Sequence, residues 1–254
     1  MMSDRPTLTI AYSTLPSRLN SITYPEKRDN REVLVLVQNF DESSYALTER
    51  SARLVELKNK GVAKSRNAAL DRASGEFLLF GDDDMKFIES GIEEALKYFQ
   101  DNPDCAIILG QAIDEEGVLR KNYVSETTPL KLTNSARAAT YEMLVRVDAL
   151  RENKIRFDEN FGAGTTNYLG DEYIFIADAL RSGLKGVHLP VKIAIHPKDS
   201  SGSRWGDEAD LSARAKVFTR VFGWKAPLYR VAFLIRTNNP WPGIGKALRF
   251  IFSR

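Results

Sequence analysis

The segment Gly61–Met85, GVAKSRNAALDRASGEFLLFGDDDM, contains the features that decide the fold. Its first part, up to Gly75, has helical spacing, and Gly75 is placed to end that helix at the C′ position. The next residues, EFLLFG, are an apolar run typical of a buried strand. Asp82, Asp83 and Asp84 follow directly. The segment predicts a helix, a buried strand and a cluster of negative charge at the end of that strand.

The aspartate triplet needs a compensating interaction, because adjacent like charges repel and the cost grows near a low-dielectric core. In extended backbone, residues i and i+2 point to the same side, so Asp82 and Asp84 would face one ligand and Asp83 would turn away. Mg²⁺ and Mn²⁺ suit carboxylate oxygens and usually take one or two carboxylates plus substrate phosphates. The alternative is that the triplet begins a loop and caps the helix expected near Ile88.

Strands and helices alternate on both sides of this segment. We predict helices over Ile88–Pro103 and Gly170–Gly183, and strands over Thr7–Ser13, Arg31–Phe40, Ala52–Asn59, Cys105–Ile113 and within 186–197. The stretch 113–160 mixes helical and strand signals. This alternation predicts an α/β fold with a mostly parallel central sheet flanked by helices. Ligands of such sheets bind beyond the carboxyl ends of the strands, where the triplet lies.

The composition is that of a soluble globular chain, with 254 residues, 43% of them hydrophobic and 28% charged. The single cysteine, Cys105, excludes an intrachain disulfide framework and a cysteine-rich zinc site. No apolar run approaches the roughly 20 residues of a spanning helix. The first residues lack the basic and apolar regions of a signal peptide. We therefore expect a cytoplasmic protein.

Charge divides the chain into two regions. Residues 211–254 contain nine Lys or Arg and no Asp or Glu, whereas residues 1–210 contain 27 basic and 34 acidic residues. We predict a catalytic domain over 1–210, with halves of about 1–112 and 113–210, and a tail of two or three short helices broken at Gly223–Pro227 and Asn238–Gly245. Basic residues interleaved with aromatic ones fit an interfacial helix on anionic lipid. The alternative is a tail whose aromatic residues pack on the catalytic domain.

The block G…RN…A.GEF…F.D.D within Gly61–Met85 resembles the core signature of family 2 glycosyltransferases, which have the GT-A fold. With a second block described below, the resemblance covers about residues 7–200. It implies that the two halves of the domain bind the nucleotide sugar and the acceptor, respectively. It also implies that Asp82 and Asp84 form the DxD motif, which holds Mn²⁺ or Mg²⁺ at the diphosphate of a nucleotide sugar.

The resemblance also implies a set of nucleotide contacts. Where the family often has paired aspartates after the second strand, this chain has Gln38-Asn39, whose amides can still hydrogen-bond a base edge. Uridine is the family's commonest base. Lys64 and Arg66 would face the nucleotide, and the alternative for them is a solvated helix face. The complete predicted nucleotide-binding set is Ala11, Tyr12, Ser13, Gln38, Asn39, Lys64, Arg66, Asp82 and Asp83.

The second block, residues 156–197, resembles the acceptor side of the family, with an acidic pair, Asp171-Glu172, opening a helix. Inverting transfer needs a base that takes the proton of the acceptor hydroxyl as the diphosphate leaves. The second residue of the family's pair is the base, so Glu172 is the first candidate and Asp171 the second. A structural alternative is that one of the two caps the helix.

His196 follows the last predicted strand, where many GT-A enzymes supply a third metal ligand. An imidazole is a tolerated ligand of Mn²⁺. A packed or hydrogen-bonded histidine is the alternative. The predicted metal ligands are therefore Asp82, Asp84 and His196.

The resemblance implies a metal-dependent inverting glycosyltransferase. It would move a hexose or N-acetylhexosamine from a nucleotide-diphosphate sugar, with UDP the expected carrier, to a hydroxyl of a glycan or lipid-linked acceptor in bacterial surface-polysaccharide synthesis. Contact with the inner face of the cell membrane is expected, and a nucleic-acid partner is not.

Two other functions remain as alternatives. A sugar-phosphate nucleotidyltransferase would need a glycine-rich basic loop after the first strand, which AYSTLPSRLNS lacks. A non-catalytic, membrane-associated binding protein on a transferase scaffold would not need the intact pairs Asp82/Asp84 and Asp171/Glu172.

Overall fold

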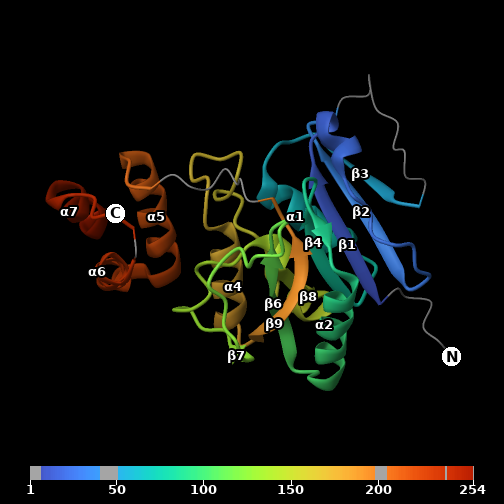
Figure 1. The fold of residues 1–254 in the computed structure, drawn as a ribbon. Helices are drawn as coiled ribbons and strands as arrows, with labels where there is room; N and C mark the ends of the chain where they lie inside the picture. The colour runs from blue at the N-terminus through green and yellow to red at the C-terminus, as the bar shows by residue number, and fades with distance from the viewer. Residues whose placement is uncertain (1–6, 41–50, 198–204, 238, 254) are drawn as a thin grey trace.

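The computed structural model describes residues 7–40, 51–197, 205–237 and 239–253. The strands within these ranges form one nine-stranded sheet in the order β3-β2-β1-β4-β8-β6-β9-β5, with β7 pairing with β9 (Figure 1). Their bounds are β1 (Leu8–Thr14), β2 (Arg31–Gln38), β3 (Arg53–Leu57), β4 (Phe77–Asp82), β5 (Lys86–Phe87), β6 (Cys105–Ile113), β7 (Thr128–Pro129), β8 (Met143–Arg146) and β9 (Lys185–Ile195).

The long strands share one direction, which confirms the predicted mostly parallel sheet. β1 pairs in parallel with β2 and β4, β2 pairs in parallel with β3, and β6 pairs in parallel with β9. β8 lies antiparallel between β4 and β6, so these two strands keep the common direction. Ser13 of β1 is in register with Asp82 of β4, so the carboxyl ends of both strands meet at one edge of the sheet.

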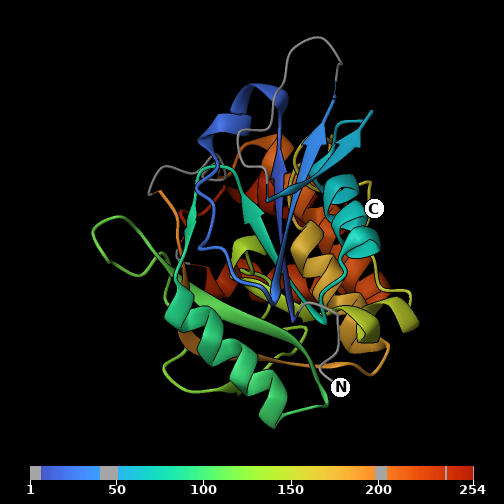
Figure 2. The ribbon, with the colours of Figure 1, turned by 90° about the vertical axis from the view of Figure 1, so that its right-hand side faces the viewer.

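Helices cover both faces of the sheet. α1 (Val62–Arg72), α3 (Val147–Glu152) and α4 (Asp171–Arg181) pack on one face, and α2 (Glu89–Asp101) and the short turn η1 (Pro16–Ser21) pack on the other. Figure 2 shows α2 and α1 on opposite sides of the strands. The mixed segment 113–160 contains β7, β8, α3 and a second short turn, η2 (Thr140–Glu142).

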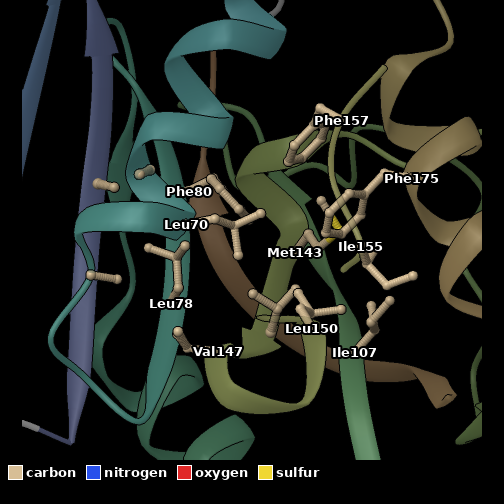
Figure 3. Packing of buried hydrophobic residues seen from close by; sticks show 14 of the residues in the cluster. Leu70, Leu78, Phe80, Ile107, Met143, Val147, Leu150, Ile155, Phe157 and Phe175 are labelled. Carbon is tan, nitrogen blue, oxygen red and sulfur yellow. The ribbon is translucent and has the colours of Figure 1, made fainter. Parts of the chain in front are cut away.

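The core beneath α1, α3 and α4 joins these helices to the sheet. Leu70 of α1, Leu150 of α3 and Phe175 of α4 share one cluster of buried residues with the strands (Figure 3). The ring of Phe157 stacks on that of Phe175 at 4.2 Å between centroids. Because α1 and α4 are packed into the same core, polar residues near their N-termini are brought together.

The prediction that Gly75 ends the first helix was wrong. α1 ends at Arg72, and the backbone N–H of Ala73 donates to the carbonyl of Ala69. A Cβ at Gly75 would lie 2.6 Å from the backbone nitrogen of Thr9 and 2.8 Å from the carbonyl carbon of Leu8. A residue without a side chain is needed at position 75 because the chain there passes close to the backbone of β1. Gly75 does not end the helix.

The described part of the chain after β9 contains three α-helices, which lie together beside α4 (Figure 1). They are α5 (Glu208–Phe222), α6 (Ala226–Arg236) and α7 (Ile244–Phe252), and the short turn η3 (Gly223–Lys225) joins α5 to α6. η3 confirms the predicted break near Gly223; residue 238, at the second predicted break, lies outside the described residues. The proposed boundary after residue 210 falls inside α5.

α5 joins the tail to the catalytic domain. Its Val217 and Val221 pack against Ile174 and Ala177 of α4. The opposite face of α5 packs with α6 and α7 around Leu234 and Phe250. No helix in the described ranges is both long and apolar enough to span a membrane.

Candidate active site

The aspartate triplet lies at the carboxyl edge of the sheet. Asp82 is the last residue of β4, and Asp83 and Asp84 form the turn that leads to β5. The strict alternation of a strand therefore does not extend to Asp84. Asp83 is buried and accepts a hydrogen bond of 2.6 Å from the hydroxyl of Thr14. Arg18 pairs with Asp83 at 2.7 Å and with Asp84 at 3.0 Å.

Asp82 is the least compensated carboxylate at this edge. Burial, together with the charges of Asp84 and Glu172, raises its pKa above the usual range, while Arg66 and His196 oppose the rise. No hydrogen bond or ion pair joins the side chain of Asp82 to another residue in the described part of the chain.

His196 lies next to the triplet. Its Nε2 is 3.6 Å from Oδ1 of Asp84, and its ring stacks on Tyr141 at 4.4 Å. Nδ1 lies 3.0 Å from the carbonyl oxygen of Pro197, to which it donates in one neutral tautomer. In that tautomer the lone pair of Nε2 is directed to the aspartate side and is available to a metal ion. His196 is therefore both a packed histidine and a potential ligand.

The predicted ligand set fits a hard divalent ion in chemistry but is not a closed cage. Among the described residues, no group of three or more His, Cys, Asp or Glu side chains is arranged to hold an ion. Mg²⁺ and Mn²⁺ do not require one, since they keep waters and substrate phosphates in their coordination shell. Asp82 and Asp84 lie at one edge of the sheet, and the side chain of Asp82 has no partner among the described residues. This arrangement suits an ion that arrives with a diphosphate.

The acidic pair lies at the first turn of α4, and an arginine of α1 binds it. Arg66 Nη1 donates to Oδ2 of Asp171 and, at 3.0 Å, to Oε1 of Glu172. The hydroxyl of Thr140 donates to the same Oε1 at 2.7 Å. The N-cap of α4 is Gly170, with φ of 88°, so neither acid is the cap. Instead both lie where the helix dipole favours negative charge.

The two carboxyl groups of this pair have opposite pKa shifts. Burial and the neighbouring Glu172 charge raise the pKa of Asp171 to about 7. Burial also opposes ionisation of Glu172, but Arg66 and the hydrogen bonds from Asp171 and Thr140 outweigh it and lower its pKa. The Glu172 side chain is 19% exposed and that of Asp171 only 4%. Glu172 is thus the ionised and accessible member of the pair.

The predicted nucleotide contacts on β1 and β2 have different positions. Ala11 and Tyr12 are buried in the two cores on opposite faces of the sheet, and the strand at these residues pairs with β2 on one side and β4 on the other. The Ser13 hydroxyl lies 2.7 Å from that of Ser65 on α1. Gln38 accepts a hydrogen bond from the backbone N–H of Gly61 at 2.8 Å. Asn39 is exposed, with φ of 51°.

On α1, Arg66 is buried against the acidic pair, which rules out a solvated helix face for it. Lys64 is half-buried near the start of the helix. The structure therefore brings Arg66, Asp82, Asp171 and Glu172 together and leaves Lys64 and Asn39 at the rim.

A cavity of about 640 Å³ opens beside the acidic pair. Arg66, Asp171 and Glu172 line one side, the loop at 136–138 lines another, and Val217 and Phe218 of α5 and Phe233 of α6 close it. The tail is therefore a wall of this cavity. Apolar and aromatic walls around a few convergent polar groups are typical of a small-molecule site.

Several residues of the site are not apparent from sequence patterns. Thr14 ends β1, Arg18 and Thr140 lie in the short turns η1 and η2, and no sequence motif marks any of the three. Their roles depend on contacts across 32 or more residues of chain, which only the fold reveals.

Comparison with known proteins agrees with this arrangement. Residues 11–151 match the model of glycosyl transferase family 2. The chain belongs to this family and is a glycosyltransferase. None of the curated proteins matches this chain.

Similar solved structures share the GT-A fold. Residues 1–349 of TarS from S. aureus, in complex with UDP-GlcNAc, align over 85% of this chain and 67% of that one, with 17% identity and a TM-score of 0.58. This chain covers 44% of the longer TarS structure at 18% identity and a TM-score of 0.58. The mannosyltransferase PcManGT from Pyrobaculum calidifontis, in complex with GDP-Man and Mn²⁺, aligns over 99% of this chain and 71% of that one, with 15% identity and a TM-score of 0.58.

Proposed function

We propose that this protein is a metal-dependent, inverting glycosyltransferase. It transfers a hexose or N-acetylhexosamine from a nucleotide-diphosphate sugar to a hydroxyl of a glycan or lipid-linked acceptor in the synthesis of a bacterial surface polysaccharide. The observation that carries the proposal is the placement of Glu172, which Arg66 and Thr140 hold at the wall of a cavity.

In this proposal Glu172 is the base. In a single in-line displacement, the acceptor oxygen forms its bond to the anomeric carbon as the bond to the diphosphate oxygen breaks. Glu172 takes the proton of the acceptor hydroxyl, for which it must be ionised and reachable. Its lowered pKa and its greater exposure favour it over Asp171. Asp171, with its raised pKa, positions Glu172 through their hydrogen bond.

Asp82 and Asp84 hold the divalent ion in this proposal, and His196 contributes Nε2. A bound ion supplies positive charge that offsets the charge developing on the leaving diphosphate. Arg18 and Thr14 hold Asp83 away from that position. The nucleotide then lies over Ser13, Gln38 and Asn39 at the same edge of the sheet. UDP is the proposed carrier, on the basis of the family resemblance.

The tail gives a physical reason to propose contact with the inner face of the cell membrane. α6 and α7 expose Leu228, Val231, Ile235, Ile244, Leu248 and Phe252, with Trp224 and Trp241 beside them. Trp224 is 84% exposed and Ile235 is 76% exposed. Exposed apolar and tryptophan side chains on a segment with nine basic and no acidic residues complement an anionic lipid surface.

A thermal-shift screen of nucleotide sugars, with and without Mn²⁺, tests the proposed reaction. A UDP-sugar should raise the melting temperature only when Mn²⁺ is present, because binding to the folded state stabilises it. Asp84→Asn should lose this shift, and Asp104→Asn, whose partner is the exposed Lys185, should keep it. A shift that is independent of both Mn²⁺ and Asp84 would contradict the metal assignment.

Co-sedimentation with phosphatidylcholine vesicles, with and without phosphatidylglycerol, tests the membrane contact. The protein should sediment with the anionic vesicles, and Leu228→Ser/Ile235→Ser should reduce that fraction several-fold. Val118→Ser/Leu119→Ser, which changes two exposed apolar residues outside the tail, is the matched control. Equal binding by all three proteins would exclude α6 from the membrane contact.

A further inference from the structure

We call the cavity of about 640 Å³ beside Asp171 and Glu172 the catalytic cavity. A second cavity, of about 540 Å³, adjoins it. Arg137, Tyr173, Arg214 and Phe218 line both. The second cavity continues from there between the loop at 133–137 and the helices α5 and α6, as far as Arg236. The two adjoining cavities therefore extend from Glu172 to the end of α6.

This second cavity is positively charged. Arg137, Arg214 and Arg236 line it, and no Asp or Glu is present among its described lining residues. We call it the arginine cavity. Arg214 is paired with Asp210 outside the cavity lining, so Arg137 and Arg236 supply the uncompensated positive charge, which attracts an anion.

Arg214 is held in a fixed orientation. Its Nε donates to the two carboxylate oxygens of Asp210 at 3.0 and 2.9 Å, and its guanidinium lies 5.4 Å from the ring of Trp205. In the described part of the chain nothing hydrogen-bonds its terminal nitrogens. A preset guanidinium with free terminal donors loses little entropy when it binds an oxyanion.

Arg137 and Arg236 are exposed and have no ion-pair partner among the described residues. Most other arginines near the site differ in this respect; Arg18 and Arg66, for example, are paired with carboxylates. Arg137 and Arg236 therefore retain their full donor capacity for a ligand.

The donor diphosphate does not account for the arginine cavity. The predicted metal ligands Asp82, Asp84 and His196 line neither cavity, while the acidic pair lines the catalytic one. The arginine cavity thus adjoins the cavity that the acidic pair lines, and its described lining does not include the predicted metal ligands.

We infer that the arginine cavity binds a phosphate or diphosphate group of the acceptor, while a sugar hydroxyl of the same acceptor reaches Glu172. This inference rests on the proposed function and names the class of its acceptor. Arginine forks match phosphate oxygens in bidentate geometry. The phosphate belongs either to a lipid-linked diphosphate saccharide or to a phosphate-containing polymer, and the recognition chemistry is the same for both.

Titration calorimetry with inorganic pyrophosphate in EDTA tests the inference without turnover and without the metal site. The wild-type protein should bind pyrophosphate, and Arg137→Gln/Arg236→Gln should bind it at least about tenfold more weakly, the loss expected for charge-assisted hydrogen bonds. Arg72→Gln, which removes one positive charge at the far end of α1, is the control and should bind as the wild type does. Asp84→Asn should also leave this binding unchanged, so failure of the donor assignment and failure of this inference give different results.

Two further results would overturn the inference. One is equal pyrophosphate affinity in the wild type and the double arginine variant. The other is a double variant that loses binding to phosphatidylglycerol vesicles but keeps pyrophosphate binding, which would assign the arginines to lipid headgroups. We expect the double variant to lose pyrophosphate binding and to keep its binding to phosphatidylglycerol vesicles. With a chemically defined acceptor, adding a phosphate next to the sugar should lower KM for the wild type far more than for the double variant.

Discussion

Arg66 on α1 and Glu172 on α4 lie 3.0 Å apart although 106 residues separate them in the chain. The same guanidinium contacts Asp171, and Thr140 donates to the same oxygen of Glu172. The shared core beneath α1 and α4 keeps these groups together. The position of the proposed base is therefore a direct consequence of how two helices pack on one face of the sheet.

Arg18 competes with a divalent ion for Asp84, because it already pairs with that carboxylate. Arg18→Gln should therefore tighten Mn²⁺ binding to the nucleotide-free protein by about 2–5-fold, the scale of an exposed ion pair. Calorimetric titration with Mn²⁺ measures this. Arg28→Gln, which removes exposed pairs with Glu89 and Glu93, should have no effect. Weaker Mn²⁺ binding by Arg18→Gln would show that Asp84 is not a ligand.

Asp171 makes stability depend on pH. Its pKa rises from the ordinary 3.8 to about 7 in the folded protein. Between these values the folded state holds a proton that the unfolded state has released, so stability falls as pH increases and levels off above about 7. The melting temperature of the wild type, measured relative to Asp171→Asn, should therefore decrease from pH 4 to 7 and then stay level. A relative melting temperature that rises with pH would contradict the assignment of the proton.

Gly75 tests the close contact between the α1–β4 connection and β1. Gly75→Ala should destabilise the fold by about 1–3 kcal/mol, as expected for overpacking against backbone. Gly245→Ala, in α7 with open space around its Cβ, is the control and should be neutral or slightly stabilising. Urea denaturation measures both. Equal stability of the two variants would mean that the chain relaxes freely at Gly75.

Much of the fold follows from residue patterns. The strands before and after the triplet, the helices α1, α2 and α4, and the break at Gly223 all have local signals, since hydrophobic spacing and turn residues act over short distances. The insertion of β8 between β4 and β6 has no such signal, because it is a pairing between distant segments.

The residues of the candidate site that form short motifs could be predicted from the sequence, and the contacts between distant segments could not. The acidic residues could be found because they form short motifs, but the partner of Arg66 could not, because that contact joins α1 to α4. The three arginines of the arginine cavity come from a loop and two tail helices. They line one cavity only because α5 packs on α4.

The kinetic effect of Glu172→Gln tests the central claim most directly. The variant should bind a UDP-sugar with Mn²⁺ as tightly as the wild type and lower kcat by about 10²–10⁴, the range for loss of a general base. Glu115→Gln, an exposed glutamate outside the catalytic cavity, should leave kcat unchanged. Near-normal kcat in Glu172→Gln, or a defect confined to donor binding, would contradict the role of Glu172 as the base.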